Sequence, residues 1–170
     1  EHRFRLEHCA ICPPDLLLRV KASQAIVVTQ PSFLYYMGQR YREEVLPHQT
    51  GWLWPIGSFH RWGLKVVFSS DSPLVTSNPL TGIYAAVTRE TETGQKLAPQ
   101  ESISPLEALE MYTLWGAYAS FEEEVKGSIR PGKFADLVVL SGDPTQIISE
   151  QLGGLRVVRT IINGKVMWEN

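Results

Sequence analysis

Two residues in this chain, His8 and Asp71, are of the types that bind metal ions and move protons. His8 ends the alternating stretch 2–8, and Asp71 follows the apolar run 65–70, so each comes at the end of a predicted strand. A neutral imidazole and a carboxylate are common ligands of a divalent cation, and the carboxylate can also act as a general base. In parallel α/β proteins the carboxyl ends of the strands carry the chemistry, which makes both residues candidates for function.

Each candidate also has a purely structural interpretation. Asp71 could cap the turn that begins at Pro73, because aspartate is a common capping residue. By strict alternation His8 lies on the same side of its strand as Phe4 and Leu6, and a lone histidine on an apolar face usually belongs to the core. These two segments alone leave both alternatives open.

Cys9 and Cys12 form a C-x-x-C motif directly after His8. This motif is compatible with a redox pair or with half of a zinc site. No second Cys/His pair follows at zinc-finger spacing, so two small thiols that fill a loop are the plainer expectation. Two cysteines are also too few for a disulfide framework and suit a reducing compartment, which predicts a cytoplasmic protein.

The elements that must position these residues form a strand–helix–strand series. Strand 2–8 is followed by a helix that begins at Pro13-Pro14-Asp15 and runs to about Ser23, and then by strand 25–29, which is the parallel crossover pattern. Segment 32–47 is either a lid-like loop or a helical insertion. The apolar run 65–70 then gives a third parallel strand, so the predicted fold class is α/β.

The second half of the chain is predicted to hold two helices followed by short strands. A helix is expected after Asn78, and another runs from a capping box at Ser104 to about Tyr118. Three short strands follow, the last two of which are joined by Asn163-Gly164, a strong hairpin signal. They are predicted at 135–140, 157–162 and 165–169. We therefore divide the chain into an α/β segment, 1–120, and a β segment, 121–170.

The bulk composition excludes several classes of partner. The chain has 170 residues and a formal net charge of −2, which gives no reason to expect nucleic acid or an anionic membrane surface. No apolar run approaches the roughly 20 residues that span a bilayer. A small-molecule substrate is the partner that this composition leaves open.

Four segments occur in the order Arg5-Leu6-Glu7-His8, Gln30-Pro31-Ser32-Phe33, Ser69-Ser70-Asp71-Ser72-Pro73 and 126–140. Together they resemble the amidohydrolase superfamily of metal-dependent hydrolases, in its N-substituted formamide deformylase-like subgroup. The last segment, which begins Lys126-Gly127-Ser128, is the most specific of the four. The resemblance covers essentially the whole chain and implies that it is the C-terminal fragment of a longer protein.

The resemblance implies a fold and a set of roles. The fold is a (β/α)8 TIM-type barrel, of which 2–8, 25–29 and 65–70 are strands six to eight, followed by the C-terminal strands of a small β-sandwich. His8 is implied as the metal ligand of strand six. Asp71 is implied as the strand-eight aspartate that contacts the metal and takes the proton of the attacking water. Gln30 and Phe33 are expected to line the substrate pocket, as an amide donor and an apolar wall.

The implied activity is hydrolysis of amide or related C–N bonds by water activated on one or two divalent ions, with zinc as the expected metal. The family's ligands from strands one, four and five have no counterpart in this sequence. Three strands also leave an unpaired edge on each side. We therefore expect the isolated chain to lack turnover and to self-associate or form a homo-oligomer, and the sequence leaves open whether it binds metal by itself. The alternative is a non-catalytic scaffold or assembly protein on the same fold.

Overall fold

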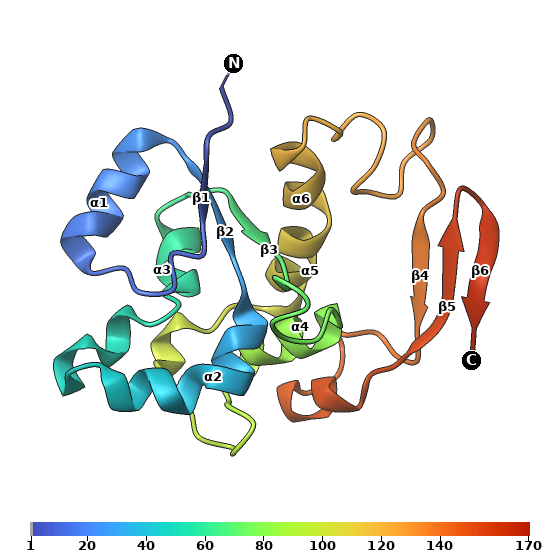
Figure 1. Cartoon of the computed structure of the whole chain (residues 1–170). Coiled ribbons are helices and arrows are strands. Elements are labelled where there is room, and N and C mark those ends of the chain that lie inside the picture. The colour runs from blue at the N-terminus through green and yellow to red at the C-terminus, as the bar shows by residue number, and fades with distance from the viewer. Residues whose placement is uncertain (1) are drawn as a thin grey trace.

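A three-stranded parallel sheet lies at the centre of the computed structural model, which describes residues 2–170 (Figure 1). Its strands are β1 (Arg5–Glu7), β2 (Ile26–Thr29) and β3 (Val66–Phe68), in the order β1-β2-β3. Glu7 pairs with Val28, and Val28 pairs with Val67, so the three carboxyl ends lie at one edge. This sheet confirms the predicted α/β class.

The burial of the strands follows their place in the sheet. All residues of β2 and β3 are buried, which suits their β-branched and aromatic side chains. All three residues of β1 are exposed, and the neighbouring Phe4 is 69% exposed. The side of β1 that faces away from β2 therefore has no strand beside it among the described residues.

Helices connect and cover the strands. The crossover from β1 to β2 is α1 (Pro14–Ser23). Segment 32–47, for which a loop and a helix were both open, is mostly helical. The remaining helical elements are α2 (Pro31–Glu44), η1 (Pro47–Trp52), α3 (Ile56–Arg61), α4 (Pro79–Thr88), η2 (Pro99–Glu101), α5 (Pro105–Tyr112), α6 (Leu114–Ala119) and η3 (Ser149–Gly154).

The two predicted helix starts are confirmed by their caps. Asn78 Oδ1 accepts a hydrogen bond from Leu80 N at 3.1 Å. Ser104 Oγ accepts from Glu107 N at 3.3 Å, and Glu107 Oε2 accepts from Ser104 N at 2.6 Å, which completes the capping box. Such caps depend on a few adjacent residues and can therefore be predicted locally.

The single helix expected from Ser104 to about Tyr118 is wrong in one respect, because it breaks at Thr113. The backbone of Thr113 has φ −118° and ψ −77°, so α5 ends before it and α6 begins after it. The Thr113 hydroxyl donates to Leu109 O at 2.7 Å. A side chain that bonds the preceding turn competes with the regular helix and favours such a bend.

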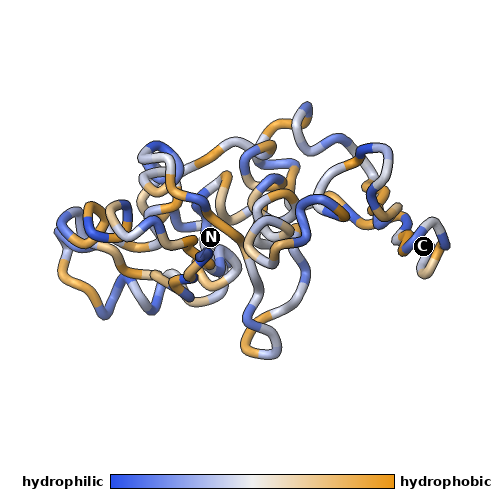
Figure 2. The backbone as a smooth tube through the Cα atoms, turned by 90° about the horizontal axis from the view of Figure 1, so that it is seen from above, coloured by the Kyte–Doolittle hydropathy of each residue, from blue (hydrophilic) through white to orange (hydrophobic). Residues whose placement is uncertain are grey.

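The predicted C-terminal strands form an antiparallel sheet of β4 (Leu137–Leu140), β5 (Val157–Ile162) and β6 (Lys165–Glu169). Asn163 and Gly164 both have positive φ, 48° and 76°, as a two-residue hairpin turn requires. In Figure 1 this sheet stands to one side of the α/β part. Figure 2 shows apolar segments in both regions, and Trp168 on β6 is 48% exposed.

The main core packs between the parallel sheet and the helices. Its largest fully buried apolar side chains include Trp54, Phe59, Leu34, Leu53 and Ile56. These residues come from α2, α3 and the segment between them. Among residues 2–170, no helix is long and apolar enough to cross a membrane.

Candidate functional site

His8 lies immediately beyond β1, at the carboxyl edge of the parallel sheet. Its backbone N donates to Val28 O at 2.7 Å, which extends the ladder by one bond. Its φ is +67°, and Cys9 N donates to Glu7 O at 3.0 Å, so His8 occupies the centre of a tight turn. A positive φ at a residue other than glycine is uncommon and concentrates at functional sites.

This turn corrects the expected placement of His8. Strict alternation put His8 on a buried face with Phe4 and Leu6, but the positive φ interrupts the alternation at His8. His8 is exposed, as are Phe4 and Leu6. The interpretation of His8 as a core histidine is therefore wrong.

Gln30 connects His8 to the neighbouring strands. It follows β2 and is only 2% exposed. Its Oε1 lies 3.0 Å from His8 Nδ1, and its Nε2 donates to Ser69 Oγ at 2.8 Å. The three carboxyl ends of the sheet are thus joined by side-chain hydrogen bonds, from β1 through β2 to β3.

The same contacts determine which nitrogen of the neutral His8 ring carries the proton. Val28 O can only accept, and it lies 3.5 Å from Gln30 Nε2, so the amide nitrogen faces Val28 and the amide oxygen faces His8. Because an amide oxygen only accepts, the proton of the neutral ring lies on His8 Nδ1. Nε2 then keeps the lone pair that a metal ligand needs.

Gln30 and Phe33, which were expected to line the substrate pocket, both lie against the His8 ring. Both amide ends of Gln30 are bonded inside the protein. The Phe33 ring is 6% exposed and stacks on the His8 ring, with centroids 6.4 Å apart and planes 20° apart. In this chain the two side chains position the His8 imidazole from two directions.

Asp71 follows β3 by three residues, at the same edge of the sheet. Ser69 N donates to Thr29 O at 3.0 Å, and the chain then leaves the ladder. Asp71 has φ +55°, which aspartate tolerates better than most residues. Its main-chain oxygen accepts from Leu74 N at 3.1 Å, whereas its exposed carboxylate has no hydrogen-bond partner among residues 2–170. The expectation that its side chain caps the turn is therefore wrong.

The donors at this edge fit part of a metal site. His8 offers Nε2 and Asp71 offers a free carboxylate, which are donor types suited to a divalent cation. Their strands both pair with β2, one on each side. However, no group of three His, Cys, Asp or Glu residues that could hold a metal occurs in the described part of the chain. A complete catalytic metal site normally has at least three protein ligands.

Cys9 and Cys12 lie beside this edge as free thiols. The Cys12 thiol donates to Pro13 O at 3.8 Å. Interaction with the Cys12 side chain lowers the pKa of Cys9, and the same interaction, together with burial, raises the pKa of Cys12. Since His8 and these two cysteines do not converge as a three-ligand cluster within residues 2–170, the structure does not support the zinc interpretation of the motif.

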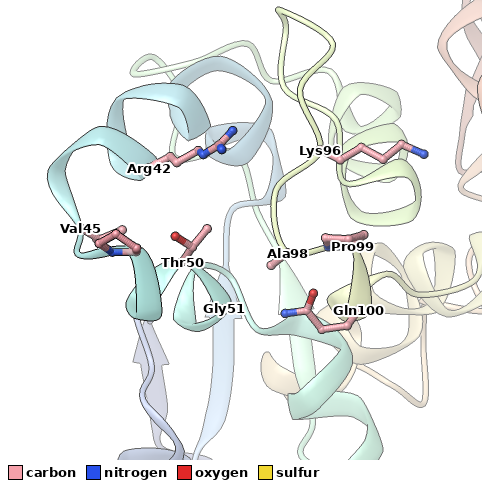
Figure 3. A pocket seen from close by; sticks show the side chains of 9 residues that line it. Arg42, Val45, Thr50, Gly51, Lys96, Ala98, Pro99 and Gln100 are labelled. Atoms are coloured by element: carbon pink, nitrogen blue, oxygen red, sulfur yellow. The ribbon is translucent and has the colours of Figure 1, made fainter.

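A separate cavity of about 490 Å³ surrounds the C-terminal end of α2 and includes Arg42, Thr50, Lys96 and Gln100 (Figure 3). Gln30 lies at the other end of α2, and 14 helical residues span about 20 Å. Arg42 Nη1 donates to Gln95 Oε1 at 3.1 Å, and in Figure 3 the Lys96 side chain points away from the cavity. This cavity is therefore remote from His8.

The parallel α/β sheet carries a histidine, a glutamine and an aspartate at its carboxyl edge, which is where α/β barrel enzymes place their functional side chains. The chain belongs to the amidohydrolase family, whose model matches residues 1–168.

Known proteins with similar sequence or structure agree with this assignment. The chain is 34% identical over 169 residues to the N-substituted formamide deformylase of Arthrobacter pascens, covering 98% of this chain and 31% of that protein. A metal-dependent hydrolase of Pyrococcus horikoshii superposes with a TM-score of 0.73 at 25% identity, covering 86% of this chain and 30% of the other.

A mutant atrazine chlorohydrolase of Arthrobacter aurescens, solved with zinc and atraton, shares the fold. Its TM-score is 0.66 at 20% identity, over 98% of this chain and 36% of the other. The chain spans about a third of the length of the curated relatives it matches, with values from 29% to 32%. The expected resemblance is thereby confirmed, including its extent as part of a longer protein.

Proposed function

We propose that this chain is the C-terminal part of a metal-dependent amidohydrolase that cleaves amide or related C–N bonds by metal-activated water. The observation that carries the proposal is the hydrogen bond between Gln30 Oε1 and His8 Nδ1. It leaves the other ring nitrogen of an exposed histidine free, at the edge where an exposed carboxylate also lies. Membership of the amidohydrolase family supports the same activity.

His8 Nε2 and the Asp71 carboxylate would hold the cation, for which zinc is our first choice because its ligands are nitrogen, oxygen and sulfur. A divalent cation bound there would lower the pKa of water from 15.7 to about 7 and polarise the substrate carbonyl. Asp71 would take the proton of the attacking water and pass it to the leaving amine. Phe33 and Gln30 would keep the His8 ring in its ligating orientation.

Within the proposal, β1, β2 and β3 are strands six, seven and eight of a (β/α)8 barrel, and β4 to β6 are the C-terminal strands of a β-sandwich. Residues 1–120 then form the partial barrel, and residues 121–170 form the C-terminal part of the β-sandwich. Two ligands are fewer than a catalytic metal site normally has, so residues outside this chain would complete the site. We therefore expect catalysis from the longer protein and not from the 170-residue chain alone.

The test compares the longer protein with variants that preserve the local backbone. Asparagine tolerates positive φ better than most residues, so His8→Asn and Asp71→Asn both suit their turns. We expect Asp71→Asn to lower kcat for N-substituted formamides by about 10²- to 10⁴-fold, as loss of a general base does. We expect His8→Asn to lower the metal content.

Circular dichroism and thermal melting should show that both variants remain folded. Full turnover by Asp71→Asn would refute the role of this carboxylate. Appreciable turnover by the isolated 170-residue chain would refute the proposal that this chain holds only part of the metal site.

A further inference from the structure

A second cavity, of about 290 Å³, is lined by residues of α2, α4 and η3. α4 packs against both α2 and η3, and η3 is the orange-red helical turn beside α4 in Figure 1. α2 contributes Tyr35 and Tyr36 to the lining, α4 contributes Tyr84, and η3 contributes Glu150. The proposed metal ligands are not among the lining residues, so this cavity is distinct from the edge of the parallel sheet.

The three tyrosine rings form one continuous aromatic wall. Tyr35 meets Tyr36 with ring centroids 4.9 Å apart and planes at 90°, and it meets Tyr84 with centroids 6.0 Å apart and planes at 82°. Tyr36 is 40% exposed, whereas the other two rings are partly buried. Rings at right angles form a corner that solvent can reach, and corners of this kind make up the aromatic cages that bind ammonium ions.

The charge beside this wall is negative. Glu150 is the one charged side chain among the described residues that line the cavity. Tyr84 Oη donates to Glu90 Oε2 at 2.5 Å, which brings a second carboxylate to the edge of the wall. Lys96 Nζ lies 3.8 Å from the other oxygen of Glu90, but this pair is largely exposed and weakly coupled. A cation is therefore favoured over an anion.

The N-terminal end of α4 also borders the cavity, and a helix N-terminus by itself attracts anions. Here its donors are partly used, because Asn78 Oδ1 accepts from Leu80 N at 3.1 Å and Pro79 has no N–H. The basic Arg156 lines a neighbouring hollow and not this one. The aromatic end of the cavity thus keeps its negative character.

Gly153 leaves room beside the Tyr84 ring. A Cβ at this position would lie 3.5 Å from both Cδ2 and Cε2 of Tyr84. The preceding Leu152 is 1% exposed and anchors η3 in the main core. A larger side chain at position 153 would therefore fill part of the cavity while η3 stays anchored.

We propose that this cavity binds an alkylammonium ion, with its charged head against the rings of Tyr35, Tyr36 and Tyr84 and with Glu150 as the counter-charge. The face of an aromatic ring carries negative potential, which attracts a cation whose hydration is weak. An ion with methyl groups on its nitrogen also makes apolar contact with the same rings. This inference does not depend on the proposed hydrolase activity.

The test uses choline and its uncharged analogue, in which carbon replaces the quaternary nitrogen. The two molecules have nearly the same shape, so any difference in affinity reports the charge. Each is titrated into the longer protein and followed by saturation-transfer proton NMR. We expect choline to bind about 5- to 30-fold more tightly than the analogue. Added salt should weaken choline binding only. Equal affinities would overturn the proposal.

Three variants locate the bound ion. Tyr36→Leu removes the most exposed ring and should weaken choline binding about fivefold or more. Gly153→Val should weaken the binding of both molecules, because it fills the cavity. Glu150→Gln should weaken the binding of choline but not that of the analogue. The matched control is Phe134→Leu, which removes a ring that is 54% exposed outside this cavity and should change neither affinity.

The competing location for a cation is the exposed Asp71 carboxylate at the sheet edge. Choline binding that persists in Tyr36→Leu but is lost in Asp71→Asn would place the ion there and would refute the proposal. Melting curves show whether each variant is folded. Tyr36 and Glu150 are both exposed, so their substitution leaves the core intact and decides the question even where Gly153→Val fails to fold.

Discussion

Replacing Gln30 by leucine separates the positioning of His8 from the stability of the fold. Leucine has a similar size but makes neither the bond to His8 Nδ1 nor the bond to Ser69 Oγ. Each lost hydrogen bond costs about 0.5–1.5 kcal/mol of stability. The His8 ring also becomes free to turn and to exchange its proton between Nδ1 and Nε2.

The expected effect on metal affinity can be stated as a range. Loss of a residue that orients a metal-ligating histidine typically weakens metal binding by about 10- to 100-fold, which corresponds to roughly 1.4–2.7 kcal/mol. We expect the low end for Gln30→Leu, because the Phe33 ring still stacks on His8. The measurement is a competition with a chromophoric chelator, made on the longer protein.

Gln30→Glu is the informative partner variant. Its carboxylate can still accept from His8 Nδ1, more strongly than the amide does. It cannot donate toward Val28 O, and it puts a charge at a site that is 2% exposed, so it should destabilise the fold. We therefore expect both variants to lower the melting temperature but only Gln30→Leu to weaken metal binding.

The control is Gln39→Leu. Gln39 lies on the same helix but is exposed; its amide nitrogen donates to Glu43 at 3.2 Å, and its amide oxygen accepts from the Thr93 hydroxyl at 3.4 Å. This variant should change neither metal affinity nor stability appreciably. If Gln30→Leu and Gln30→Glu weaken metal binding equally, the positioning argument fails and Gln30 is merely structural.

Two further predictions concern stability. A Cβ on Gly82 would lie 2.0 Å from Tyr112 Oη, so Gly82→Ala should destabilise the protein by about 1–3 kcal/mol in urea titrations. The control is Gly116→Ala, whose added Cβ would meet nothing within 4 Å and which should be neutral or stabilising. The Arg3 guanidinium bonds Glu123 and lowers the pKa of that carboxyl from 4.5 to about 2. The stability that the Arg3–Glu123 pair adds to the fold is complete above pH 4.5 and is lost as the pH falls through 2. The difference in melting temperature between wild type and Glu123→Gln should therefore shrink across that range. A difference that is constant from pH 6 to pH 2 would refute the linkage.

Much of the fold could be predicted because its signals are local. The buried strands follow from short β-branched runs, and the Ser104 cap follows from residues three apart. The hairpin follows from two adjacent residues, Asn163 and Gly164. In each case the residues that determine the structure are close to one another in the chain.

The details of the site could not be predicted because they depend on distant contacts. Gln30 bonds partners 22 and 39 residues away, so nothing near it in the sequence showed that its amide is fully used. Ser69 was not singled out as a functional residue, although it follows β3 much as Gln30 follows β2. The turn at His8 also escaped prediction, because a strand pattern cannot reveal a positive φ at its last residue.

The open edge of β1 and the incomplete ligand set point to the same side of the molecule. Every residue of β1 is exposed, and Phe4 and Leu6 show apolar surface there, at 69% and 37% exposure. A further parallel strand beside β1 would cover this surface and pair its backbone groups. Its carboxyl end would then lie next to His8, where the proposed metal site needs additional ligands. One structural addition would therefore satisfy both the sheet and the proposed metal site, and without it self-association through this edge is the expected alternative.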